Sequence, residues 1–244
     1  MNTLRLKNLI KANKIANCAA EILLDVIVVM RAKVTGSYTD QKEDFIAKKI
    51  LAEKFHLSDK DIKYIDIGAN NFRRGNNSYL FYRGGSRGIL VEADPMLCEK
   101  LRAKRKGDRV INVAVSTESN DSIDFYVLSL PTRSTLDAGH VQGAIAAGLS
   151  VKEVIKVPCI NLNDLLEQEN FEPDFMSIDI EGVDYKVLGS LDFKKHPIKV
   201  IIAEVSGEKN EHGETMDEFM MRIGYTVYGK YGSNVIYVWC NVCA

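Results

Sequence analysis

The sequence contains 244 residues, of which 46% are apolar and 27% are charged. This length suits one large domain, or one domain with a small extension, and the apolar content excludes a mainly disordered chain. The 32 basic and 33 acidic side chains leave a net charge of −1, which argues against a dedicated nucleic-acid-binding protein. Five scattered cysteines are typical of an intracellular protein rather than a disulfide scaffold, so we expect a cytoplasmic location.

Residues 1–60 are expected to form a helical extension that precedes the main domain. An apolar stretch ends at Met30, but Glu21 and Asp25 interrupt it, so it predicts neither a signal peptide nor a membrane-spanning helix. An amphipathic helix here covers the domain, pairs with a second subunit in a homo-oligomer, or makes a peripheral contact with an anionic membrane. The pattern favours packing within the molecule or between subunits over the membrane. Residues 1–17 contain no acid and four bases, Arg5, Lys7, Lys11 and Lys14.

After a predicted helix at residues 40–57, the chain changes character. Residues 61–244 alternate short β-rich runs with helical patterns, which is typical of a parallel sheet in an α/β domain. We expect buried strands at residues 64–68, 89–93, 110–115, 175–180 and 200–205. Helices are expected at residues 95–106, 162–168, 185–190 and 215–223. Residues 225–228 and 234–239, separated by a Gly-Ser-Asn turn, predict a closing hairpin.

An insertion between the third and fourth of these strands is expected to select the substrate. Residues 122–129 predict an extra strand. The small residues of 139–148, together with Arg133 and His140, indicate either a mobile loop over the cleft or a plain connector.

The first chemical signal lies where the first predicted strand ends, in the run from Asp66 through Gly68 to Asn70. In open α/β sheets a ligand binds beyond the carboxyl ends of the strands, and a glycine there lets the backbone approach it closely. Glu92 ends the second strand, 24 residues after Gly68, at the distance typical of an acid that accepts hydrogen bonds from ribose hydroxyls. The pair therefore predicts a site for a nucleoside cofactor.

The glycine spacing indicates which cofactor this is. A dinucleotide site needs the pattern GxGxxG, so that a helix N-terminus can meet the pyrophosphate. Residues 68–75 contain no second glycine two places after the first. S-adenosylmethionine, which carries ribose and adenine without phosphate, fits better, and an NAD-dependent oxidoreductase is the less favoured alternative.

Four motifs in this order resemble the FkbM family of S-adenosylmethionine-dependent methyltransferases. They are the runs DIGAN at 66–70, EADP at 92–95, NVAV at 112–115 and SIDIEGVD at 177–184, and the resemblance covers residues 64–239. It implies an α/β, Rossmann-like class I methyltransferase fold, with a seven-stranded, mostly parallel sheet whose last strand is antiparallel. It also implies O-methylation of a sugar, glycan or other hydroxylated small molecule, such as a secondary metabolite.

The resemblance and the strand ends together indicate which residues contact the cofactor. Glu92 is expected to hold the ribose, while Asp66 and Gly68 shape the pocket for the methionine end. An alternative role for Asp66 is that of a structural carboxylate that caps a nearby loop. The full set of expected cofactor contacts is Asp66, Gly68, Asn70, Glu92, Asp94, Pro95, Met96, Asn112, Ala114 and Asp179.

The fourth predicted strand carries the expected chemistry. Asp179 and Glu181 lie two residues apart, so both are expected on one side of the sheet or in one cleft beyond it. Methyl transfer to a hydroxyl requires removal of a proton, and Glu181 is the first choice for the general base. Asp179 is expected to face the cofactor's charged end or the acceptor. His140 and His212 are weaker choices for the base.

Two alternatives stay open at this level. With Glu204, these acids offer oxygen ligands to a divalent metal, but the ligand set is incomplete and no metal is predicted. A protein that keeps the nucleoside pocket but has lost catalysis is the competing functional class.

Overall fold

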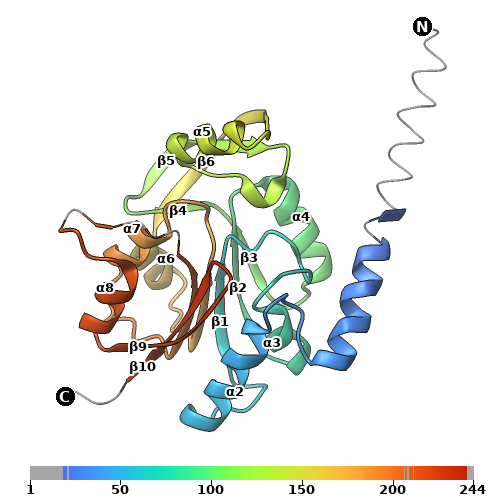
Figure 1. The fold of residues 1–244 in the computed structure, drawn as a ribbon, viewed down its shortest axis with the longest axis vertical. Helices are drawn as coiled ribbons and strands as arrows, with labels where there is room; N and C mark the ends of the chain where they lie inside the picture. Colours follow the sequence, from blue (N-terminus) through green and yellow to red (C-terminus); the bar gives the residue numbers. More distant parts are fainter. Residues whose placement is uncertain (1–18, 21, 206, 208, 211, 241–244) are drawn as a thin grey trace, which may run out of the picture.

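A mixed β-sheet forms the centre of the molecule (Figure 1). The computed structural model describes residues 19, 20, 22–205, 207, 209, 210 and 212–240. In this part of the chain the sheet has seven strands in the order β3-β2-β1-β7-β8-β10-β9. Of these, β10 runs in the opposite direction to the other six. In that order the strands span Arg109–Asn112, Arg87–Glu92, Lys63–Ile67, Phe175–Ile178, Val200–Glu204, Asn234–Trp239 and Tyr225–Tyr231. The predicted class I methyltransferase topology and the closing hairpin are both confirmed.

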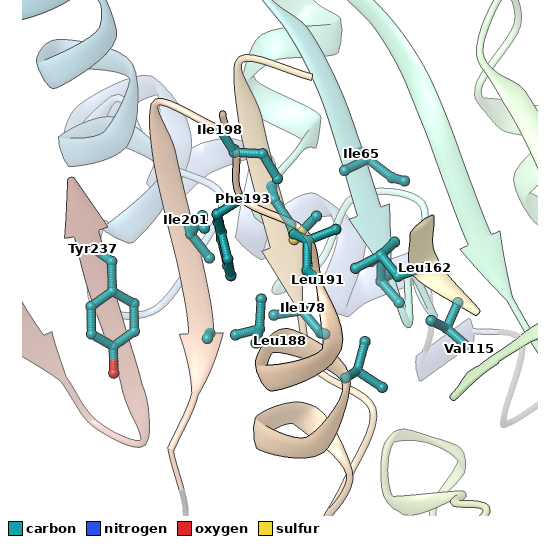
Figure 2. Close-up of a cluster of buried hydrophobic side chains, with 14 of the residues drawn as sticks. Ile65, Val115, Leu162, Ile178, Leu188, Leu191, Phe193, Ile198, Ile201 and Tyr237 are labelled. Atoms are coloured by element: carbon teal, nitrogen blue, oxygen red, sulfur yellow. The ribbon is translucent and has the colours of Figure 1, made fainter. Parts of the chain in front are cut away.

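Helices cover both faces of this sheet, because its central strands are apolar on both sides. One face packs against α6, α7 and α8, and Figure 2 shows part of that core, in which Ile65 and Ile201 of the sheet meet Leu162 and Leu188 of the helices. The other face packs against α2, α3 and α4, with Tyr64 among its buried residues. The helices span Leu162–Gln168, Asp184–Ser190, Met216–Arg222, Glu43–Phe55, Tyr79–Gly84 and Pro95–Lys104, in the order in which they are named here.

A second, smaller sheet forms the insertion. The predicted strand at residues 110–115 is broken at Val113, so that β4 (Ala114–Ser116) leaves the central sheet and pairs with β6 (Val151–Asn161). The expected extra strand is present as β5 (Asn120–Leu128), antiparallel to β6. A short 3-10 turn, η1 (Pro131–Arg133), follows β5.

The expectation of a loop at residues 139–148 is wrong, because a helix, α5 (Ala138–Ala146), occupies most of this segment. Asp137 begins it by accepting hydrogen bonds from the backbone N–H groups of Gly139 (2.6 Å) and His140 (3.0 Å). Alanine is the strongest helix former, and the alanines here outweigh the two glycines. Figure 1 shows α5 beside β5 and β6, above the central sheet.

The described part of the expected extension is helical, while residues 1–18 and 21 lie outside the described residues. Residues 22–35, called the N-terminal helix below, lie at the edge of the molecule (Figure 1, blue). The predicted helix at 40–57 is α2, and its Ala47 and Leu51 share a core with Tyr64 of β1, so this part of the expected extension packs as part of the domain. Among the described helices, none is long and apolar enough to span a bilayer.

Gly68 directly follows β1 and lies against the backbone that follows β7. Its φ of +80° lies in the left-handed region, and a Cβ on this residue would lie 1.9 Å from the carbonyl oxygen of Asp179. Gly232, in the hairpin turn, also has a positive φ, +63°, but a Cβ there would meet no atom within 4 Å. A substitution at Gly232 therefore adds backbone strain alone, whereas a substitution at Gly68 adds both backbone strain and a steric clash.

We expect Gly68→Ala to lower the free energy of unfolding by more than about 3 kcal/mol, because the clash adds to the strain. Gly232→Ala should cost about 1 kcal/mol, the strain alone. Urea denaturation of both variants gives the comparison. Equal losses would mean that β1 and β7 do not approach as closely as described.

Candidate functional site

A pocket opens beyond the carboxyl ends of β1, β2 and β7, at the switch point of the strand order. It brings together residues far apart in the sequence, including most of those expected to contact a cofactor. The expected site residues that line it are Asp66, Gly68, Asn70, Glu92, Asp94, Ala114, Asp179 and Glu181.

Glu92 joins two walls of this pocket. One of its carboxylate oxygens accepts a hydrogen bond from the N–H of Asn70 and the other from the N–H of Asp94, both at 2.8 Å. Burial raises the pKa of Glu92 to about 7, although these two hydrogen bonds favour the ionised form. Each carboxylate oxygen can accept one more hydrogen bond, so two neighbouring hydroxyls of a ligand can bind here.

Asp66 lines the pocket and also holds a loop in place, as its alternative role predicts. Its Oδ2 accepts hydrogen bonds from Asn76 Nδ2 (2.8 Å) and Ser78 Oγ (2.6 Å). Asn76 donates in addition to the carbonyl oxygen of Ala69 at 3.0 Å. Burial raises the pKa of Asp66 above its usual range. Asp66 therefore fixes the loop between β1 and α3, which forms one side of the pocket.

Arg105, which the sequence analysis did not identify, supports the same loop from behind. It is fully buried and donates hydrogen bonds to the carbonyl oxygen of Phe72 (3.1 Å), to Asn76 Oδ1 (3.1 Å) and to Ser78 Oγ (3.0 Å). Its Nε donates to Asp108 at 2.8 Å. A basic residue at the end of a helix looks like ordinary surface in a sequence, and only the tertiary structure shows what it contacts.

Three of the expected cofactor contacts lie outside the pocket lining. Asp94 caps α4 by accepting from the N–H of Met96 (2.7 Å), and this places Pro95 and Met96 in the first helical turn, with Met96 69% exposed. Leu97, one position further round the helix, lines the pocket instead. Asn112 donates to the carbonyl oxygens of Glu92 and Ala93, both at 2.9 Å, and so stabilises the end of β2.

Asp179 and Glu181 both follow β7, which ends at Ile178, so Asp179 lies in the loop after the strand and not inside the expected strand at 175–180. They still meet, because one carboxylate oxygen each of Asp179, Glu181 and Glu204 lies within 4.8 Å of the others. Asp179 is open to the pocket, although protein surrounds it on the other sides. Burial and the charges of Glu204, Asp184 and Glu181 raise the pKa of Asp179 well above its usual range.

Glu181 differs from Asp179 in having partners. It is 6% exposed, with a φ of +54°, and its Oε2 accepts a hydrogen bond from Arg133 (2.8 Å) and lies 3.1 Å from His140 Nε2. Burial raises the pKa of Glu181, and the hydrogen bond from Arg133 opposes this. Among the described residues, none donates a hydrogen bond to the Asp179 carboxylate. The two acids are thus distinct in their surroundings.

The loop that carries both acids is shaped by Asp184, the first residue of α7. Its carboxylate accepts from the N–H groups of Ile180 (3.0 Å) and Gly182 (3.3 Å). Burial raises the pKa of Asp184 to about 7. His212 is not among the residues that line the pocket.

The three clustered carboxylates are ligands of the kind that Mg²⁺ prefers. Arg133, however, already binds Glu181 and places a positive charge where a cation would lie. The absence of a metal therefore stays a prediction.

Residues 66–227, more than half of the chain, match the model of the methyltransferase FkbM domain. No curated protein matches the sequence.

Solved structures of methyltransferases resemble the chain at low identity. An O-methyltransferase from Bacillus cereus in complex with SAH has 15% identity and a TM-score of 0.43, over 88% of this chain and 90% of that one. A methyltransferase from Geobacter sulfurreducens has 13% identity and a TM-score of 0.41, over 93% and 96%. A putative RNA methyltransferase from Pyrococcus horikoshii has 13% identity and a TM-score of 0.38, over 80% and 81%. The family match establishes that the chain belongs to the FkbM family of methyltransferases, whose cofactor is S-adenosylmethionine.

Proposed function

We propose that this methyltransferase transfers the methyl group of S-adenosylmethionine to a hydroxyl oxygen of a sugar, a glycan or another hydroxylated small molecule. The observation that carries the proposal is the Asp179 carboxylate, which faces the pocket next to the Gly68 loop and has no hydrogen-bond donor among the described residues. A carboxylate with a raised pKa is a stronger base near neutral pH, and an attacking hydroxyl must lose a proton.

The pocket residues fit S-adenosylmethionine. Gly68 lets the backbone approach a ligand closely, and Glu92 offers acceptors for two ribose hydroxyls. When bound, the cofactor supplies an electrophilic methyl group on a positively charged sulfur. Asp179 and Glu181 place negative charge on the pocket wall that favours such a ligand.

The two acids have different roles in this proposal. Asp179 accepts the proton that the acceptor hydroxyl loses when the hydroxyl oxygen is methylated. Glu181, the first choice of base from the sequence, is held by Arg133 and His140, so its lone pairs are partly used and its charge is partly neutralised. Glu181 therefore acts as a positioning residue that holds Arg133, whose neighbours Thr132 and Ser134 line the pocket.

Turnover with a panel of acceptors tests the function. The protein should release S-adenosylhomocysteine when given hydroxylated sugars or their nucleotide-linked forms. Tight binding of S-adenosylmethionine with no release in any mixture would favour the competing class, a binding protein that has lost catalysis. The glycan acceptor and the cytoplasmic location both stay predictions.

Asp179→Asn should lower kcat by about 10²–10⁴-fold, because the proton acceptor is lost. The affinity for S-adenosylmethionine, measured by calorimetry, should change much less. Glu181→Gln should act mainly on the KM of the acceptor. Glu167→Gln removes an exposed partner of Lys195 and is the control for a lost carboxylate. If Glu181→Gln abolishes turnover while Asp179→Asn keeps it, Glu181 is the base.

The pH dependence of cofactor binding tests the role of Glu92. Ribose hydroxyls donate to the ionised carboxylate, and the pKa of Glu92 lies at about 7 before the ligand binds. The affinity for S-adenosylmethionine should therefore fall as the pH drops below 7, by up to about tenfold per pH unit, because a proton competes. Glu92→Gln should bind weakly at every pH and controls for titration of the ligand. The same pH slope in both proteins would remove Glu92 from the ribose site.

A further inference from the structure

The N-terminal helix carries an apolar stripe that the rest of the molecule does not cover. Four of its large apolar side chains are spaced by four, three and four residues, which places them on one side of a helix. All four are more than half exposed: Leu23 (60%), Ile27 (51%), Met30 (65%) and Val34 (87%). Ile22 and Val26 extend this surface, called the apolar stripe below, at 60% and 47% exposure. An exposed patch of this kind marks an interaction surface.

The opposite side of the N-terminal helix packs against the domain, so the apolar stripe faces away from the domain. Val28 and Ala32 are buried against the domain. Asp25 forms an ion pair with Arg73 (2.7 Å), and Arg31 donates to the carbonyl oxygen of Thr39 (2.9 Å). The helix therefore has one side for the domain and one side for something else. In Figure 1 it stands at the edge of the molecule.

The charges near the apolar stripe are basic. On the described part of the helix, Lys33 lies beside the stripe, while Arg31 is paired with Asp40, and Asp25 is turned to the domain and paired with Arg73. The sequence before the helix, residues 1–17, adds four bases and no acid, although the chain as a whole is close to neutral. An apolar helix face with basic flanks is the pattern of a helix that lies in the interface of an anionic membrane.

A second copy of the chain fits this surface less well. Two copies joined through the apolar stripe would bring the basic residues of both chains together, and like charges across an interface oppose association. An anionic lipid surface is attracted to the same residues. Each base near such a surface strengthens binding, and salt weakens this attraction.

We propose that the N-terminal helix docks this protein on the surface of an anionic lipid bilayer, with the apolar stripe in the headgroup region and without crossing the membrane. The Asp25–Arg73 ion pair connects the helix to the loop in which Asn71 and Arg74 line the cofactor pocket. Docking therefore holds the pocket near the bilayer. The inference stands on the helix alone and does not depend on the proposed acceptor.

Vesicle sedimentation with the full chain tests the docking. The wild type should sediment with vesicles that mix phosphatidylglycerol with phosphatidylcholine, less so at high salt, and little with pure phosphatidylcholine. Ile27→Ser with Met30→Ser should weaken binding to the anionic vesicles by about tenfold or more, because two apolar side chains are lost from the stripe. Val154→Ser with Met221→Ser, which removes two comparably exposed side chains (48% and 52%) from the domain, should bind like the wild type.

Two results would overturn the proposal. One is that the wild type fails to sediment with anionic vesicles, or that the stripe variant binds them as well as the wild type does. The other is that the wild type is a dimer without lipid in sedimentation velocity, that the stripe variant is a monomer, and that neither binds vesicles. The second result would mean that another copy of the chain covers the stripe.

Discussion

The close contact between the backbones at Gly68 and Asp179 is the constraint on which the site depends. β1 and β7 pair in parallel up to Ile67 and Ile178, and the N–H of Asp179 still donates to the carbonyl oxygen of Ile67 at 3.0 Å. The next residue of β1 must then lie against the carbonyl of Asp179, where a side chain has no room. This contact sets the Asp179 carboxylate beside the loop that leads from β1 to Asn70. Glu92 holds that loop from the neighbouring strand through the N–H of Asn70.

A shared electrostatic feature follows from this arrangement. Asp66, Glu92, Asp179 and Glu181 surround one pocket, and burial raises the pKa of each of them. Confined carboxylates destabilise the folded protein when they are ionised and unpaired. A cationic sulfonium ligand offsets part of that cost, because it favours the ionised form of the acids around it. The near-neutral net charge of the chain therefore conceals an acidic pocket and a basic N-terminal segment.

The sequence alone predicted the sheet and most of the pocket, because both depend on local patterns. Apolar runs gave the central strands, and the parallel strand ends brought Asp66, Glu92 and Asp179 together. Other features depend on contacts across the fold. The partners of Glu181 come from the insertion, tens of residues earlier in the chain, and no local pattern indicates that Arg133 and His140 reach it.

The structure differs from the sequence-based expectations at α5 and at Met96, and both differences have local causes. The small residues of 139–148 predicted a loop or a connector, whereas Asp137 supplies a cap that makes a helix favourable there. Met96 was expected to contact the cofactor, but in the helical turn that Asp94 caps it is exposed, and Leu97 lines the pocket instead. In both cases an aspartate caps the helix, and the direction of the side chains in the first turn depends on that cap.

A crystal structure of the protein with S-adenosylhomocysteine tests the central claim most directly, since the claim is geometric. The account predicts that both ribose hydroxyls lie within hydrogen-bonding distance of the Glu92 carboxylate, with the sulfur near Asp179 and the backbone of Gly68. A ligand whose ribose lies away from Glu92, or whose sulfur is on the far side of the pocket from Asp179, would contradict it.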